Sequence, residues 1–255
     1  GPVNRVALDL AAAIQRFGGN SKIVSGGGLM VAEAQRANVE HETISISSVN
    51  PIGNPAGKIA GKLTEWDAQL VHSHGEDAAG LVIKAVGKHR VPHVVSLYDL
   101  PVRRNGKPTP GLQTALKGDR VLLASPFLQN LLSEAGYLHD VNASVVPPGL
   151  AVNALHPSVV TAARLTRMVR DMEITAQSPV IIFPAALQDS AGHDAVIEAL
   201  KQHLDKTWVC LFIGVGQAER RYHYRLSQKL EAEGLERRIK IYEGTEDPAT
   251  LYKLT

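Results

Sequence analysis

The stretch FPAALQDSAGHDAVIEAL, residues 183–200, predicts the end of a buried strand, a tight loop and the start of an amphipathic helix. At such a junction, backbone N–H groups and the positive end of the helix dipole face outward and favour an anion. The loop carries Ala185, Ala186 and Ala191, and no cation precedes His193. The sequence therefore predicts a site that is shaped for a phosphate group but lacks side-chain charge.

Strands and helices alternate on both sides of this junction. Towards the C-terminus we expect strands at 179–184, 207–214 and 238–244, each followed by a helix. Towards the N-terminus we expect an opening helix from residue 3, then strands at 21–25, 42–46, 68–74, 92–97 and 119–125 with helices between them. This alternation indicates βαβ units and parallel sheets with helices on both faces.

The regular pattern is interrupted after Gly149 by an irregular stretch that contains Pro157, followed by a helix near 159–173. We therefore expect two Rossmann-like α/β domains, residues 1–155 and 156–255. Both ends look cut, because the opening helix has no strand before it and the second series stops after three strands.

Composition narrows the classes of function. The formal net charge of the 255 residues is only +2, which argues against nucleic acid as a partner. The single cysteine, Cys210, lies in an apolar run suited to a central strand. We recognise neither a signal peptide nor an apolar run of the ~20 residues needed to span a bilayer, so we expect a cytoplasmic protein.

Two common kinds of chemistry lack their motifs. The dinucleotide fingerprint Gly-x-Gly-x-x-Gly is met by Gly214 and Gly216 but has Glu219 at its third position, and there is no Walker motif. Zinc is disfavoured because no further Cys or His stands at ligand spacing from His72 and His74.

Polar residues collect where two neighbouring strands are expected to end. His72 and His74 alternate with Ser73, from which we expect only one histidine to point to a given face. Either one packs in the core and the other is hydrogen-bonded at the rim, or His74 faces a ligand. Glu76 and Asp99 could form a pair of carboxylates for acid–base work. Alternatively such residues cap helices, as we expect of Asp77.

Several segments resemble the group 1 retaining glycosyltransferases of the GT-B fold over nearly all 255 residues. The opening GPVNRVALDLAAAIQRFGGNSKIVS is similar to the family's Gly-Gly-x-Glu-Arg helix and second strand. AQLVHSH and VLLAS resemble its strands before two site loops, and SVVPPGLAVNALHP resembles its hinge. The stretch quoted first, with CLFIGVGQ after it, resembles the family's donor-binding region.

The resemblance implies a function and a set of site residues. It implies retaining transfer of a sugar from a nucleotide-sugar donor to a glycan or lipid-linked acceptor, as in cell-envelope polysaccharide synthesis. It implies no metal and no cofactor, and leaves room for contact with the inner face of the membrane. The implied residues are His74, Glu76 and Tyr98 for catalysis, Gly1 and Pro2 for the acceptor or phosphate loop, Gly149 for the hinge, and Ala186, Ala191, Gly192, His193, Gly214, Gly216 and Glu246 for the donor.

The chain departs from this family where charge matters most. Ala186 and Ala191 stand at the Arg and Lys positions that neutralise the donor diphosphate, and Tyr98 stands at a histidine position. Three explanations stay open: a catalytically silent paralogue that acts as a binding or scaffolding protein, deliberate alanine substitution, or phosphate binding by His193, Arg220 and Arg221. The simpler interpretation of those last three residues is surface exposure. By the resemblance, we expect the region that would carry the family's Glu-x7-Glu motif to lie beyond Thr255.

Overall fold

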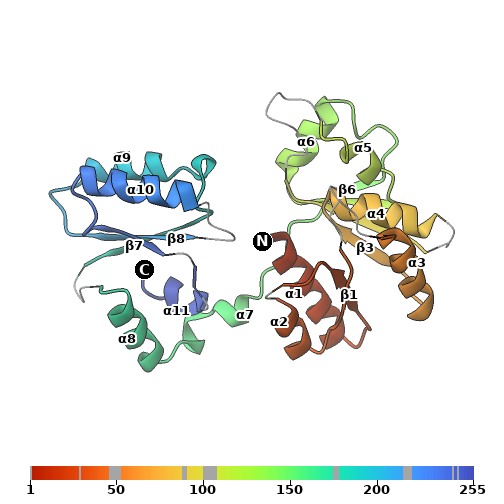
Figure 1. The fold of residues 1–255 in the computed structure, drawn as a ribbon, viewed down its shortest axis with the longest axis horizontal. Coiled ribbons are helices and arrows are strands. Elements are labelled where there is room, and N and C mark those ends of the chain that lie inside the picture. The colour runs from red at the N-terminus through yellow and green to blue at the C-terminus, as the bar shows by residue number, and fades with distance from the viewer. Residues whose placement is uncertain are drawn as a thin grey trace. The chain divides into compact units, whose positions relative to one another are not determined.

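The computed structural model describes residues 2–28, 30–45, 53–87, 91–99, 108–174, 178–214, 220–242, 244–245 and 247–255. It divides the chain into two compact units, Pro2–Leu150 and Ala151–Thr255. Each unit combines parallel strands with intervening helices (Figure 1). The expected α/β class with Rossmann-like parallel sheets is confirmed.

The N-terminal unit contains two parallel sheets, one of β1 and β2 and one in the order β3-β4-β5-β6. Its strands are β1 (Lys22–Ser25), β2 (Glu40–Thr43), β3 (Val71–His74), β4 (His93–Leu97), β5 (Arg120–Leu123) and β6 (Ala143–Val145). Its helices are α1 (Pro2–Arg16), α2 (Val31–Arg36), α3 (Pro55–Glu65), α4 (Glu76–Val86), α5 (Leu112–Ala115) and α6 (Pro126–Glu134).

The core of this unit lies on the two middle strands of the larger sheet. Val95, Val121 and Leu123 are fully buried there, and Leu128 and Leu132 of α6 pack in the same cluster. Helix α6 begins as the sequence predicts, because the Ser125 hydroxyl accepts a hydrogen bond from the Leu128 N–H at 3.2 Å and Pro126 occupies the first turn.

The C-terminal unit has one parallel sheet in the order β7-β8-β9. Its strands are β7 (Val180–Ala185), β8 (Val209–Gly214) and β9 (Ile239–Tyr242). Its helices are α7 (Val152–Leu155), α8 (Ala162–Asp171), α9 (His193–Lys201), α10 (Arg220–Ala232) and α11 (Pro248–Tyr252), with short 3₁₀ turns η1 (Pro157–Val159) and η2 (Asp189–Ala191).

Helices cover both faces of this sheet. In Figure 1, α9 and α10 lie on one face and α8 and α11 on the other. Strand β8 is buried along its whole length, and Cys210 lies within it as predicted. Its side chains alternate between two clusters, Cys210 and Phe212 packing with α9 and α10, and Leu211 with α11.

Three local expectations need correction. The strand expected at 42–46 lies earlier, at Glu40–Thr43, where it pairs with β1 through polar residues that give no apolar signal; residue 46 lies outside the described part. The stretch after Gly149, expected to be irregular, contains the helix α7, and the helix α5 was not expected either. Both helices have four residues and are too short to show a helical period in the sequence. None of the described helices is long and apolar enough to cross a membrane.

Candidate functional site

A column of three aromatic rings lies at the carboxyl ends of β3 and β4. The rings of His72 and His74 stack with centroids 4.3 Å apart, and the His74 and Tyr98 rings are almost parallel at 5.9 Å. His74 Nδ1 lies 2.6 Å from the Tyr98 hydroxyl, and His72 Nε2 lies 2.8 Å from the Ser96 hydroxyl. These contacts hold both histidine rings in fixed orientations.

The expectation that only one histidine points to a given face is wrong. Residues two apart in a strand share a face, so His72 and His74 lie side by side. Ser73, between them, points to the other face, where its hydroxyl lies 2.8 Å from Nε2 of the buried His93. The imidazoles of His72 and His74 are both hydrogen-bonded partly buried groups, and neither is packed in the apolar core.

This ring column carries no charge at neutral pH. Burial and, to a smaller extent, the neighbouring His72 lower the pKa of His74 to about 4. Burial also lowers the pKa of His72 and raises the pKa of Tyr98. The column can therefore orient a hydroxyl group of a ligand by hydrogen bonding, but it does not offer a cation to a phosphate.

Glu76 stands beside the column in the first turn of α4. Its carboxylate accepts a hydrogen bond from the Thr109 hydroxyl. A Cβ on Gly111 would come within 3.0 Å of this carboxyl group, so the absence of a side chain there leaves room for it. Asp99 is exposed, and no hydrogen bond joins these two carboxylates. The prediction that Asp77 caps α4 is wrong, because the N-cap is Gly75 and Asp77 lies in the first turn.

In the C-terminal unit, the loop between β7 and α9 presents backbone and no cationic side chain. Ala186 and Ala191 are half-buried, and η2 leads into Gly192, which has φ +89° and is the N-cap of α9. Glycine adopts this left-handed conformation without strain and has no side chain that could accept from the first-turn N–H groups. Helix α9 therefore begins with uncapped donors at the carboxyl end of β7.

The acidic residues of this junction are paired with α10. Asp189 of η2 forms an ion pair with Arg225, and Asp194 in the first turn of α9 accepts a hydrogen bond from Lys229 at 2.7 Å. These contacts connect the loop to the neighbouring helix. They also balance negative charge that would otherwise repel an anion at the start of α9.

His193 is a core residue. It is fully buried, its ring packs edge-on against Phe183 and Phe212 at centroid distances of 5.1 and 4.9 Å, and Nδ1 lies 3.2 Å from the Tyr222 hydroxyl. Burial lowers its pKa. The expectation of surface exposure is thus wrong for His193, because the residue starts a helix on its apolar side. It is confirmed for Arg220 and Arg221.

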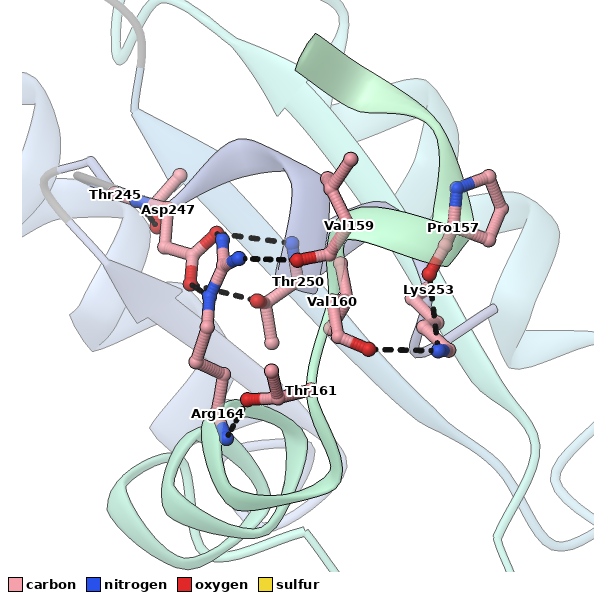
Figure 2. Close-up of polar contacts among 9 residues, drawn as sticks. All are labelled: Pro157, Val159, Val160, Thr161, Arg164, Thr245, Asp247, Thr250 and Lys253. Carbon is pink, nitrogen blue, oxygen red and sulfur yellow. Dashed lines mark hydrogen bonds and ion pairs between the residues drawn. The ribbon is translucent and has the colours of Figure 1, made fainter. Parts of the chain in front are cut away.

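The loop after β9 is anchored to the segment that opens the C-terminal unit (Figure 2). Asp247 accepts hydrogen bonds from Arg164 Nη2 at 2.6 Å and Nε at 2.9 Å. It also caps α11 by accepting from the Thr250 N–H at 3.0 Å. The Arg164 guanidinium holds the pKa of Asp247 below its usual range. Lys253 donates to the carbonyls of Pro157 and Val160 and completes the anchor.

The remaining candidate residues are distributed as follows. Gly214 is buried at the end of β8, and because β7, β8 and β9 are parallel, their carboxyl ends lie at the same edge of the sheet. Pro2 is the first residue of α1, and Gly149 has ordinary backbone with nothing within 4 Å of an added Cβ. Gly1, Gly216 and Glu246 lie outside the described residues.

Sequence reasoning missed three contributors to these sites. Ser96 orients His72, Tyr222 orients His193, and Arg164 orients Asp247. Only Ser96 carried a signal, because its place near a strand end opposite the histidines could have been read from strand alternation. The other two depend on contacts between segments far apart in the sequence. Among the described residues, no group of three His, Cys, Asp or Glu side chains could hold a metal ion.

Comparison with solved structures defines the class of fold. A glycosyltransferase from Rickettsia africae matches with a TM-score of 0.81 and 21% identity, over 100% of this chain and 68% of that chain. Anabaena HepE in complex with UDP-glucose matches with a TM-score of 0.81 and 17% identity, over 98% and 68%. Sucrose-phosphate synthase from Thermosynechococcus elongatus matches with a TM-score of 0.74 and 12% identity, over 97% and 66%. The fold is that of the GT-B glycosyltransferases.

The family follows from the sequence itself. Residues 3–153 match the model of Glycosyltransferase Family 4, which covers more than half of the chain. The chain belongs to this family. A search of curated proteins found no match.

Proposed function

We propose that this chain transfers a sugar from a nucleotide-sugar donor to a glycan or lipid-linked acceptor with retention, as the group 1 enzymes do. The observation that carries the proposal is the uncapped start of α9, where Gly192 leaves first-turn N–H groups without a side-chain acceptor at the carboxyl end of β7. Such a helix start binds phosphate groups. Anabaena HepE, whose fold this chain shares, has been crystallised with UDP-glucose.

In this proposal the donor diphosphate lies against the N-terminus of α9. The bond between the sugar and the diphosphate breaks, a bond to the acceptor oxygen forms, and the acceptor proton passes to the departing phosphate. Negative charge grows on that phosphate as the bond breaks, so N–H donors fixed beforehand stabilise the transition state. The proposal also assigns the donor to Gly214 at the end of β8 and to Gly216 and Glu246, which lie outside the described residues, and it uses neither a metal nor a cofactor.

The acceptor side of the proposal uses the N-terminal unit. His74 and Tyr98 are neutral, hydrogen-bonded to each other and able to orient sugar hydroxyl groups. Glu76, held by Thr109, supplies an acceptor for a hydroxyl proton. Acceptors of this kind belong to cell-envelope polysaccharide synthesis in the cytoplasm, at the inner face of the membrane when the acceptor is lipid-linked.

A second function is favoured by one specific observation. Ala186 and Ala191 place methyl groups where the resemblance expects the cations that hold the diphosphate. A protein with these residues could keep the fold and serve as a silent binding or scaffolding paralogue. The two functions differ in whether the chain has measurable affinity for a nucleoside diphosphate.

The deciding experiment is calorimetric titration of the chain with UDP, GDP and ADP, with a matched pair of variants. Gly192→Asn tolerates the left-handed backbone and adds no charge, whereas Gly192→Asp places a carboxylate at the start of α9. We expect one of the nucleotides to bind, more weakly to the Asn variant and not measurably to the Asp variant, because both side chains can accept from the first-turn N–H groups and only Asp adds a negative charge. If none of the three binds the unmodified chain, the silent paralogue is the correct function.

A further inference from the structure

The first residue of α9 carries a buried imidazole with an unused nitrogen. His193 is fully buried, and its Nε2 has no hydrogen-bond partner in the described part of the chain. Its Nδ1 lies 3.2 Å from the Tyr222 hydroxyl. A buried polar atom without a partner is costly in free energy, and an apolar side chain would fill this place without that cost. The presence of a titratable ring here therefore needs an explanation.

Aromatic rings surround this imidazole. Phe183 of β7 and Phe212 of β8 meet it at interplanar angles of 85° and 72°, so that in each pair an edge meets a face. The Tyr222 ring of α10 has its centroid 5.6 Å away. Burial raises the pKa of Tyr222, and it raises the pKa of Cys210 in β8 to about 12, so both groups are neutral. Aromatic faces at such distances stabilise a cation.

The charged groups on the elements beside His193 form pairs of opposite sign. Asp194 of α9 pairs with Lys229 of α10. Asp189 of η2 pairs with Arg225 of α10. Burial lowers the pKa of His193, and Asp194 raises it to a smaller extent. The imidazole is therefore neutral at pH 7 as long as no further negative charge approaches.

We infer that His193 takes up a proton from solvent when the diphosphate of a sugar nucleotide binds at the start of α9, and so supplies the positive charge that Ala186 and Ala191 do not. This inference rests on the proposed function. A protonated ring donates from both nitrogens, and the Tyr222 oxygen can accept from Nδ1. The proton is thus held beside the ligand without direct contact between the imidazole and a phosphate oxygen.

The size of the effect follows from the place of His193 in the helix. Because it is the first residue of α9, a diphosphate bonded to the first-turn N–H groups lies on the order of 8 Å from the ring. At that distance and an effective dielectric constant of ~20, each negative charge raises the pKa of an imidazole by about 1.5. The two charges of the diphosphate oppose the effect of burial.

Calorimetry in buffers of different ionisation enthalpy counts the protons. The probes are UDP-glucose, GDP-glucose and ADP-glucose, whose diphosphates lack the ionisation near pH ~6 of a terminal phosphate. At pH 7 we expect uptake of about 0.5 proton or more per bound sugar nucleotide, read from the slope of binding enthalpy against buffer enthalpy. The affinity should increase as the pH falls from 8 to 6, by about three- to tenfold per pH unit.

A matched pair of variants assigns the proton. His193→Asn removes the titrating ring, so the uptake should fall to zero and the affinity should no longer depend on pH. His203→Asn makes the same change at an exposed residue just after α9 and should keep the uptake. The ¹⁵N chemical shifts of the His193 ring, recorded in the unmodified chain with and without UDP-glucose, report its protonation even if His193→Asn does not fold.

The outcomes separate this inference from the proposed function. Binding without proton uptake overturns the inference and leaves the proposed function standing, and so does uptake that persists in His193→Asn. If none of the three sugar nucleotides binds the unmodified chain, both are overturned.

Discussion

The N-terminal unit presents side chains at the carboxyl edge of its sheet, whereas the C-terminal unit presents backbone at the corresponding edge. In the first, His72, His74 and Tyr98 form an ordered neutral column. In the second, Gly192 and two alanines expose the start of a helix. Hydroxyl groups suit the first arrangement and anions the second. The proposed function assigns the acceptor to the first arrangement and the donor to the second, so the comparison between the two sheet edges is also a test of that proposal.

The largest effect is expected when cationic side chains are added to the loop between β7 and α9, because the two sheet edges then no longer differ in presenting side chains or backbone. We expect the double variant Ala186→Arg/Ala191→Lys to bind UDP about 100-fold or more tightly than the unmodified chain, since each charge-assisted contact contributes about 1.5–3 kcal/mol. Isothermal calorimetry measures the change. The control Ala199→Arg/Gln202→Lys adds the same charge at the far end of α9. Equal gains in both double variants would show that net charge alone is responsible.

Acid is expected to lower the stability of the N-terminal unit more than that of the C-terminal unit. Three of the four described histidines with a lowered pKa lie in the N-terminal unit, and His93, whose pKa is lowered to about 4 by burial, is almost fully buried. Between pH 6.5 and about 4 the unfolded chain binds more protons at His93 than the folded chain does. Its contribution to stability is complete above pH 6.5 and is lost as the pH falls towards 4, by on the order of 2 kcal/mol.

Fluorescence can follow this loss in each unit separately. The chain has two tryptophans, Trp66 in the N-terminal unit and Trp208 in the C-terminal unit. Single-tryptophan variants, unfolded in urea at pH 7 and pH 4.5, should show the larger loss with Trp66 as reporter. His93→Asn should flatten this pH dependence. A larger loss reported by Trp208 would contradict the assignment.

Backbone strain tests the C-terminal edge without adding charge. Gly192→Ala places a Cβ on a residue with φ +89°, at a cost of about 1–2 kcal/mol in the free energy of unfolding. The control Gly149→Ala changes a glycine with ordinary backbone and open surroundings and should cost less than about 0.5 kcal/mol. Urea denaturation compares the two. Equal costs would mean that the left-handed N-cap is not required.

The smallest effect is expected in the ring column. Tyr98→Phe removes the hydroxyl that bonds to His74 and should destabilise the chain by about 1 kcal/mol. Under the proposed function, the rate of sugar transfer should fall about tenfold or less, because the Tyr98 hydroxyl orients His74 and carries no charge at neutral pH. Tyr252→Phe, on a half-exposed side chain, is the matched control. If the transfer rate of Tyr98→Phe is unchanged although the hydrogen bond to His74 is lost, Tyr98 is not part of the acceptor site.

Local sequence signals predict most of the fold and part of the site. Ser125 and Pro126 mark the start of α6, and the apolar run around Cys210 marks a central strand, because both depend on neighbouring residues. The burial of His193 could not be predicted, since it depends on Tyr222 in another helix. That His72 and His74 share a face could have been predicted, because residues two apart in a strand point to the same side, and the opposite prediction was wrong.

The anchor between Arg164 and Asp247 has a consequence for biosynthesis. The two residues are 83 positions apart, and Lys253 holds the same entry segment through Pro157 and Val160. A ribosome therefore releases the beginning of this unit long before it makes the residues that secure it. Contacts of such long sequence separation form late. The entry segment should stay open to proteases on the nascent chain until residues 247–253 have emerged.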